Sequence, residues 1–241
     1  MRKRILSWVM MFSMVIGLLP AVPVMAADPL AVGATYTDRW PESLTENVTD
    51  ITLTQAIAPN NALTVGNGQT LIIHGNGAIA GASGGITFIT VENGGHLVLD
   101  QVEVRDNTVD ANGVVYVKDG GLLDLGYNDR RARIAPGISG NTSGGTAKNL
   151  VIKDGATIRL NAEVKKSIGI SYASALYAPV SLIQGGRYTI QGSDLGTGKI
   201  ISDSTSYTQV MYNDQIILRN ANEETTLLVC GLYFQQRRQR K

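Results

Sequence analysis

Five charged side chains carry most of the binding chemistry that this sequence offers. Asp100, Glu103 and Asp106 fall within one short stretch, and Asp124 and Arg159 occupy the same position in two copies of a repeated phrase. Carboxylate oxygens are ligands for Ca²⁺, so these residues are the best candidates in the chain for a patch that contacts calcium or sugar. The alternative is a row of carboxylates that are only solvated, because lone Asp and Glu are mostly exposed.

No catalytic centre is expected from the residue types. His74 and His96, the two histidines of the chain, lie at different positions of the repeat without a clustered third ligand, so a zinc site is not expected. No serine has a nucleophile-elbow context, and no phosphate-binding glycine loop opens a helix. Cys230, the single cysteine, is expected to be a small core residue. We therefore expect no catalytic residue, no metal and no cofactor.

A nine-residue motif, called the phrase below, occurs four times. The strands that it predicts must position the charged side chains named above. Its copies span 65–73, 91–99, 117–125 and 152–160. Each has a β-branched residue, then Asn or Asp followed by Gly, then two aliphatic residues one position apart. The glycines of the first three copies are 26 residues apart and the fourth follows 35 later. Such a period is the mark of stacked units that cannot bury their apolar faces alone.

Each phrase predicts a strand, a tight bend and a second strand. The Asx-Gly pair forms the bend, since Gly accepts a positive φ and Asx tolerates the left-handed region. Alternate residues of a strand share a face. The pairs expected to point inward are Leu71 with Ile73, Leu97 with Leu99, Leu123 with Leu125, and Ile158 with Leu160. The residues between them, on the other face, are Ile72, Val98, Asp124 and Arg159.

Two arrangements of the strands fit this pattern. In a solenoid, equivalent strands stack in parallel about 4.8 Å apart. In an antiparallel meander, each Asx-Gly is a type I′ hairpin turn. The insertion before the fourth copy, around 127–133, favours the solenoid, because a corner tolerates an extra loop without loss of register. Looser echoes at 182–190 and 210–218 add weak support.

Two further features predict how the units are joined and closed. Asn107 and Asn141 each follow an aliphatic residue by three positions, so they could stack at a bend and hydrogen-bond across units, or be exposed turn residues. Trp40, with Tyr36, lies ahead of the first unit and could cover the open end of the stack.

The beginning of the chain predicts secretion. Residues 1–4 are basic, 5–19 are apolar, and 24–26 supply small residues for a cleavage site, which is the pattern of a secretory signal peptide. An uncleaved anchor is the alternative, but Pro20 and Pro23 break the run. We expect an extracellular or cell-surface protein with no transmembrane segment after cleavage.

Charge and the C-terminal sequence bear on the partners. The net charge of +1 gives no electrostatic reason for a nucleic-acid partner. The basic groups at 130–133 and 237–241 are expected to be a solvated loop and a frayed end. The chain finishes with an apolar stretch at 227–234 and this basic tail, which predicts either a truncated end or a last strand.

The segments 71–79, 138–142 and 151–157 resemble coils of the pectin-lyase-like right-handed parallel β-helix proteins, and in particular secreted surface proteins of Gram-positive bacteria. Residues 164–171 resemble the segment that closes such a helix. The resemblance implies an all-β, right-handed parallel β-helix, a solenoid of about five to seven coils. Some relatives are polysaccharide lyases or hydrolases. Their paired aspartates, Gly-His-Gly and Arg-x-Lys are missing here, and the nearest match is 73–75.

The predicted organisation has five parts: a signal peptide (1–26), an N-terminal cap or linker (27–47), a parallel β-helix (48–172), a closing β-region (173–220) and a C-terminal strand with a basic tail (221–241). The expected function is that of a secreted, non-catalytic surface protein for adhesion or structure, with cell-wall or host glycans as possible partners. The alternatives are a carbohydrate-active enzyme of the pectin-lyase type and a glycan-binding module without turnover.

Overall fold

The computed structural model describes residues 33–128, 134–173, 180–196, 198–221, 228–229 and 232–233. The predicted signal peptide, the arginines of 130–133, Cys230 and the basic tail at 237–241 lie outside these residues. Contacts divide the chain into Met1–Ala31 and Val32–Lys241, and every element below belongs to the second unit.

The described chain is all-β, with 47% strand and 2% helix. Its one described helix is a 3-10 turn, η1, at Gly192–Asp194. No helix among the described residues has the length and apolar character to cross a membrane.

A nine-stranded sheet, here the first sheet, contains the second strand of every repeat. In spatial order its strands are β1 (Ala34–Thr37), β2 (Val48–Thr52), β5 (Thr70–His74), β8 (His96–Asp100), β11 (Leu122–Leu125), β16 (Thr157–Leu160), β18 (Val180–Gly185), β21 (Gln215–Asn220) and β20 (Tyr207–Tyr212). Pairing is parallel from β1 to β18, and the last two pairs are antiparallel.

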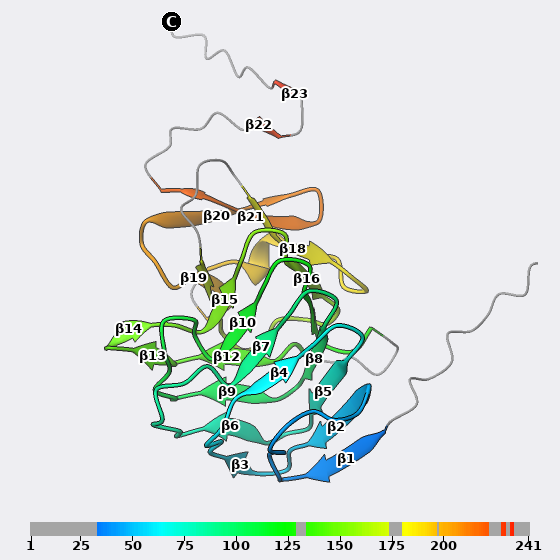
Figure 1. Cartoon of the computed structure of the whole chain (residues 1–241). Coiled ribbons are helices and arrows are strands. Elements are labelled where there is room, and N and C mark those ends of the chain that lie inside the picture. Colours follow the sequence, from blue (N-terminus) through cyan, green and yellow to red (C-terminus); the bar gives the residue numbers. More distant parts are fainter. Residues whose placement is uncertain are drawn as a thin grey trace, which may run out of the picture. The chain divides into compact units, whose positions relative to one another are not determined.

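A ten-stranded sheet, here the second sheet, is parallel throughout. Its strands are β3 (Ala56–Ile57), β6 (Ala78–Ala80), β9 (Glu103–Arg105), β12 (Gly137–Ser139), β17 (Ile168–Tyr172), β15 (Leu150–Ile152), β10 (Val115–Val117), β7 (Ile89–Val91) and β4 (Leu63–Val65), with β19 (Ile200–Ser202) paired to β17. In Figure 1, β3, β6, β9 and β12 rise in one series, and β4, β7, β10 and β15 rise in a second. One sheet curls through 297° as a half-barrel.

The four repeats stack in register. Leu71, Leu97, Leu123 and Ile158 are successive partners on neighbouring strands, and so are Ile73, Leu99, Leu125 and Leu160. All eight side chains are at most 1% exposed. Full burial of such a side chain stabilises by about 1.5–3 kcal/mol. The predicted inward aliphatic pairs are confirmed, and parallel stacking, not a meander, joins the copies.

The outer face of the first sheet is partly covered. Ile72 and Val98 are only 7% and 5% exposed, and with Val48 they form a small apolar cluster. Tyr127, from the insertion before the fourth repeat, packs against this cluster. Tyr127 therefore shields outer positions of the sheet.

The Asx-Gly pairs lie at bends of the chain that stack on one another from coil to coil, and these bends are called corners below. Gly68, Gly94, Gly120 and Gly155 all have positive φ, whereas the Asx before each does not. The N–H of each of the first three donates to the C=O of the next glycine at 3.0–3.1 Å. A Cβ built on Gly94 would lie 2.1 Å from Oδ1 of Asn67, and one on Gly155 would lie 1.9 Å from Oδ1 of Asp119. Glycine is thus needed for two reasons: it adopts the positive φ, and it has no Cβ to collide with the Asx side chain of the preceding coil.

A hairpin forms where two consecutive turn residues have positive φ. Asn213 and Asp214 have φ of 45° and 58°, and they join β20 to β21 in antiparallel pairing. This is the backbone of a type I′ turn. The echo at 210–218 is therefore a hairpin and not a further coil. Two short hairpins are also described: β13 (Thr142–Ser143) with β14 (Thr146–Ala147), and β22 (Leu228–Val229) with β23 (Leu232–Tyr233).

Residues ahead of β2 pack against the N-terminal end of the core. Tyr36, Trp40 and Leu44 are partly buried against it, and Nε1 of Trp40 donates to the C=O of Asn61 at 3.1 Å. This is the position predicted for Trp40 and Tyr36. Tyr36 itself belongs to β1, which extends the first sheet by a parallel strand within the region expected to be a cap or linker. At the other end, β17 does not close the second sheet, because β19 pairs beyond it.

Alanine substitutions at Gly94 and at Gly68 should separate the cost of the positive φ from the cost of a clash with the Asx side chain of the preceding coil. Both glycines have φ near +75°, but nothing lies within 4 Å of a Cβ on Gly68. We expect Gly68→Ala to cost about 1 kcal/mol from the left-handed backbone, and Gly94→Ala to cost roughly 1 kcal/mol more. In an Asn67→Ala background the difference should vanish. Urea unfolding measures it, and equal costs in the native background would refute the stacking.

Candidate functional site

The most connected polar group on the first sheet is centred on Asp124 of β11. Arg159 of β16 donates to it through Nε at 2.7 Å and Nη2 at 2.6 Å. His96 Nε2 lies 2.8 Å from Oδ2, and Asn161 Nδ2 donates to Oδ1 at 3.0 Å. Asp124 is 1% exposed. We call Asp124, His96, Arg159 and Asn161 the Asp124 cluster.

The Asp124 cluster holds an ionised carboxylate. Burial raises the pKa of Asp124, but hydrogen bonds from His96 and Arg159 outweigh burial and leave its pKa below the ordinary value. The pKa of Arg159 is raised by the same hydrogen bond. Because an ionised carboxylate can only accept, Nε2 of His96 donates. Asp124 is a candidate binding residue in the sequence, and in the structure its oxygens are occupied by three neighbouring side chains.

A second contact between a histidine and an aspartate lies on the same sheet, toward its N-terminal end. His74 Nε2 is 2.8 Å from Oδ1 of Asp50 and 3.1 Å from Oγ1 of Thr52. The ring of His74 also contacts that of Tyr127, with centroids 5.9 Å apart. The two histidines thus bond to different aspartates, one on the preceding strand and one on the next, so neither joins a common site.

Asp100 ends β8 beside these residues. It pairs in register with His74 and is only 3% exposed. Gln101, which has a positive φ of 63°, donates from Nε2 to Oδ2 of Asp100 at 3.3 Å. Asp100 is therefore a buried residue at a bend and does not face solvent.

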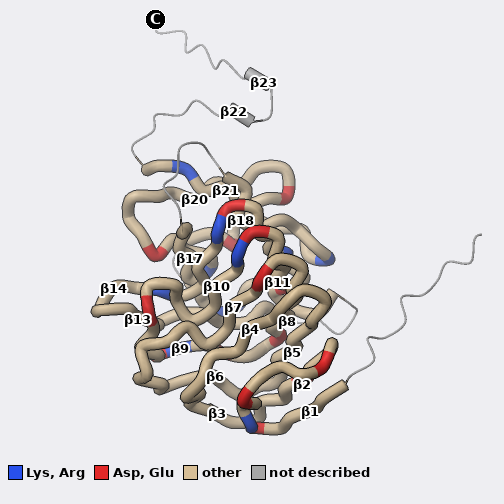
Figure 2. Tube along the Cα trace, in the orientation of Figure 1, with Lys and Arg blue, Asp and Glu red and all other residues tan. Residues whose placement is uncertain are grey.

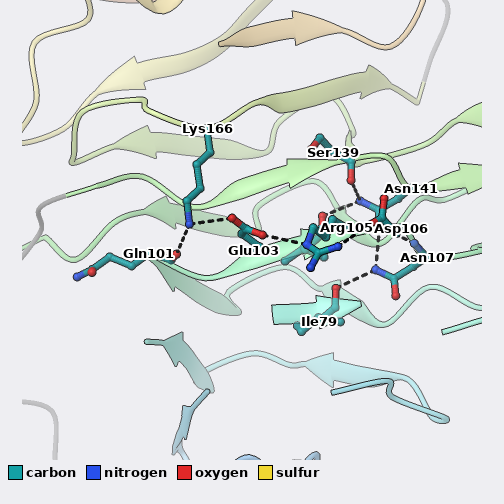
Figure 3. Close-up of polar contacts among 10 residues, drawn as sticks. Ile79, Gln101, Glu103, Arg105, Asp106, Asn107, Ser139, Asn141 and Lys166 are labelled. Carbon is teal, nitrogen blue, oxygen red and sulfur yellow. Dashed lines mark hydrogen bonds and ion pairs between the residues drawn. The ribbon is translucent and has the colours of Figure 1, made fainter. Parts of the chain in front are cut away.

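Glu103 lies on β9 of the second sheet and Asp106 directly follows this strand, and both contact Arg105 (Figure 3). Arg105 donates to Glu103 Oε2 at 2.9 Å and to Asp106 Oδ2 at 2.5 Å. Lys166 reaches Glu103 Oε1 at 3.1 Å. The hydrogen bond from Lys166 is the main reason that the pKa of Glu103 is lowered. Glu103 is only partly buried, and it is paired with two cations.

The predicted binding residues therefore divide into three groups. Asp124 and Arg159 contact each other, Glu103 and Asp106 share a cation, and Asp100 lies at the end of β8. No group of three or more His, Cys, Asp or Glu in the described part of the chain is arranged to hold a metal ion. In the view of Figure 2, charges of both signs lie interspersed along the trace.

A buried asparagine ladder runs beside the second sheet. Asn107 Nδ2 donates to Oδ1 of Asn141 at 2.8 Å, and Asn141 Nδ2 donates to Oδ1 of Asn149 at 2.9 Å. Asn149 Nδ2 then donates to Oδ1 of Asp203 at 2.7 Å. Asn107 and Asn141 also donate to the C=O of Ile79 and of Val104, on preceding strands or their ends (Figure 3). The predicted stacking of Asn107 on Asn141 is confirmed.

The hydrogen bond between Asn149 and Asp203 passes over β17 at Gly169, where the absence of a Cβ leaves room for both side chains. A Cβ on Gly169 would lie 2.4 Å from Nδ2 of Asn149 and 2.4 Å from Oδ1 of Asp203. Sequence reasoning missed Asn149 and Asp203, since neither repeats the Asn-Thr signal of Asn107 and Asn141. It also missed Asn161 and the role of His96. The sequence signal for Asn161 is its place directly after the fourth repeat.

Comparison of the chain with known proteins gives no match to any family model, to any curated protein or to any solved structure. The function must therefore be argued from the residues and the geometry.

Loss of the Asp124 carboxylate should destabilise the fold in a pH-dependent way. Removing one partner of a buried ion pair costs about 3–5 kcal/mol, and because Arg159 is partly exposed we expect about 3 kcal/mol for Asp124→Asn at pH 7. Since the pKa of Asp124 is lowered in the fold, its contribution is present above the unfolded value, about 3.9, and is lost as the pH falls below it. Urea unfolding at pH 7 and pH 3 measures both.

The matched control is the exposed pair of Lys118 and Glu92, 2.6 Å apart. Lys118→Met should cost less than about 1 kcal/mol at pH 7. Equal losses for the two variants, or a cost of Asp124→Asn that persists at pH 3, would contradict the role given to Asp124.

Proposed function

We propose that this chain is a secreted, non-catalytic surface protein built on a right-handed parallel β-helix of about five to seven coils, similar to the pectin-lyase-like surface proteins, and that it serves in adhesion or structure. The parallel sheets and the in-register repeats support the architecture. The handedness follows from the strong preference of parallel crossovers for the right hand. The basic, apolar and small-residue pattern of 1–26 supports secretion.

One observation carries the non-catalytic assignment. The polar side chains whose types could serve in catalysis or ligand binding are hydrogen-bonded to neighbouring coils instead. Asp124 accepts from His96 on the preceding strand and from Arg159 on the next. Asn141 links Asn107 to Asn149 inside the stack. Buried polar groups need such partners, so these residues act as cross-links of the scaffold.

The geometry favours this function over a carbohydrate-active enzyme. A general acid on a glycan needs a carboxyl that keeps its proton near neutral pH, and so a raised pKa. Asp124 and Glu103 have lowered pKa values, for the reasons given above. They also lie on different sheets, on β11 and β9.

A turnover screen tests the assignment. The purified chain, expressed from Ala27, is incubated with pectin, alginate and host-type glycans, with and without calcium, and assayed for reducing ends and for unsaturated products. We expect neither product. Release of either, if abolished in Asp124→Asn or Glu103→Gln at temperatures where the variant stays folded, would overturn the proposal.

Calcium provides a separate measurement. Because Glu103 and Asp106 are already paired with cations, we expect the melting temperature to be the same in millimolar calcium and in EDTA. A calcium-dependent rise that disappears in Asp100→Asn/Asp106→Asn would restore the metal patch considered from the sequence.

A further inference from the structure

An open hollow of about 390 Å³ lies near the C-terminal end of the stack, between the end of η1, β19 and β20. Its lining includes Ser204, Thr205, Tyr207 and Thr208. It lies away from the Asp124 cluster and from the Glu103 group, and shares no residue with either. Its volume lies within the usual range of small-molecule sites, about 300–1,000 Å³.

The lining of the hollow is polar but uncharged. Besides the hydroxyl side chains it includes Gln209, and Leu195 and Ile201 supply apolar surface. Hydroxyl groups both donate and accept, as do the hydroxyls of a sugar. An anionic ligand would call for Arg or Lys, and none lines the hollow. The chemistry matches a neutral saccharide.

An aromatic side chain completes the match. Tyr207 is partly buried against the core and also lines the hollow. Ile201, 41% exposed, is one of the few large apolar residues that the described chain leaves open to solvent. A sugar ring presents C–H groups on its faces and hydroxyls around its rim, so apolar and hydroxyl surfaces side by side suit it.

The rim of the hollow is anchored by the asparagine ladder. Asp203, the last member of the ladder, lies between two lining residues, Ser202 and Ser204. Its Oδ2 accepts from the N–H of Asn149 at 3.0 Å and from Oγ of Ser171 at 3.0 Å. Ser202 Oγ donates to the C=O of Ser204 at 2.8 Å. A rim held in this way loses little conformational freedom when a ligand binds, which favours affinity.

We propose that this hollow binds a neutral saccharide, one to a few sugar units in size, without turnover. The proposal deepens the function given above, and rests on it, by assigning the glycan contact of a non-catalytic surface protein to one site.

Binding is tested on a glycan array that holds neutral glucans, galactans, mannans and N-acetylglucosamine oligomers beside polygalacturonate and alginate. The oligosaccharide that gives the strongest signal is then titrated by calorimetry. We expect a neutral ligand, with affinity weakened about tenfold or more in Thr205→Ala/Thr208→Ala, because two hydroxyl partners are lost. The matched control is Thr64→Ala/Thr90→Ala on β4 and β7, which removes two hydroxyls elsewhere and should leave the affinity unchanged.

The outcomes separate this inference from the function on which it rests. No binding to any neutral glycan, binding to anionic glycans alone, or equal affinity of both double variants would overturn the hollow as the site, while the non-catalytic assignment stands if no product forms. Cleavage of any glycan on the array would overturn the proposed function itself. Circular dichroism and melting of each variant show that it is folded before it is titrated.

Discussion

The contact on which the rest of the structure depends is the stack of Asx-Gly corners. At each corner one residue, glycine, turns the chain through a positive φ, and from the second corner on the Asx of the preceding coil lies over it. Backbone hydrogen bonds join Gly68 to Gly94, Gly94 to Gly120, and Gly120 to Gly155. This corner sets the register of the strand that follows, and a shift of one residue would move every aliphatic side chain to the wrong face.

Register at the corner decides where the polar side chains lie. Because β8, β11 and β16 start from stacked corners, Val98, Asp124 and Arg159 fall in one row across the sheet. Arg159 can then reach Asp124 with two nitrogens. The asparagine ladder is a second product of the same stacking, since Asn107 and Asn141 occupy the same bend on successive coils. In a parallel stack, polar groups at one position become cross-links.

The sequence predicts the contacts between equivalent positions of the repeat, but not the contacts made by residues that break the repeat. The aliphatic rows and the Asn107–Asn141 contact follow from periodicity, because each copy meets its equivalent. Burial of Asp124 does not, since it depends on Arg159 and Asn161 from one coil later. Asn149 joins the ladder because the β13–β14 hairpin returns the chain to the bend. The turn at Asn213 became a hairpin because two residues in a row, not one, take positive φ.

The most direct measurement of the central claim, parallel stacking in register, is disulfide trapping on the outer face of the second sheet. Thr64 pairs with Thr90, and Thr90 with Tyr116. With Cys230 replaced by Ser, the double variants Thr64→Cys/Thr90→Cys and Thr90→Cys/Tyr116→Cys should cross-link on mild oxidation, because parallel neighbours are about 4.8 Å apart and within disulfide range. Thr64→Cys/Tyr116→Cys spans two strand spacings, about 9.6 Å, and should not. Efficient cross-linking of that last pair, or none in the first two, would contradict the stacked register and the account built on it.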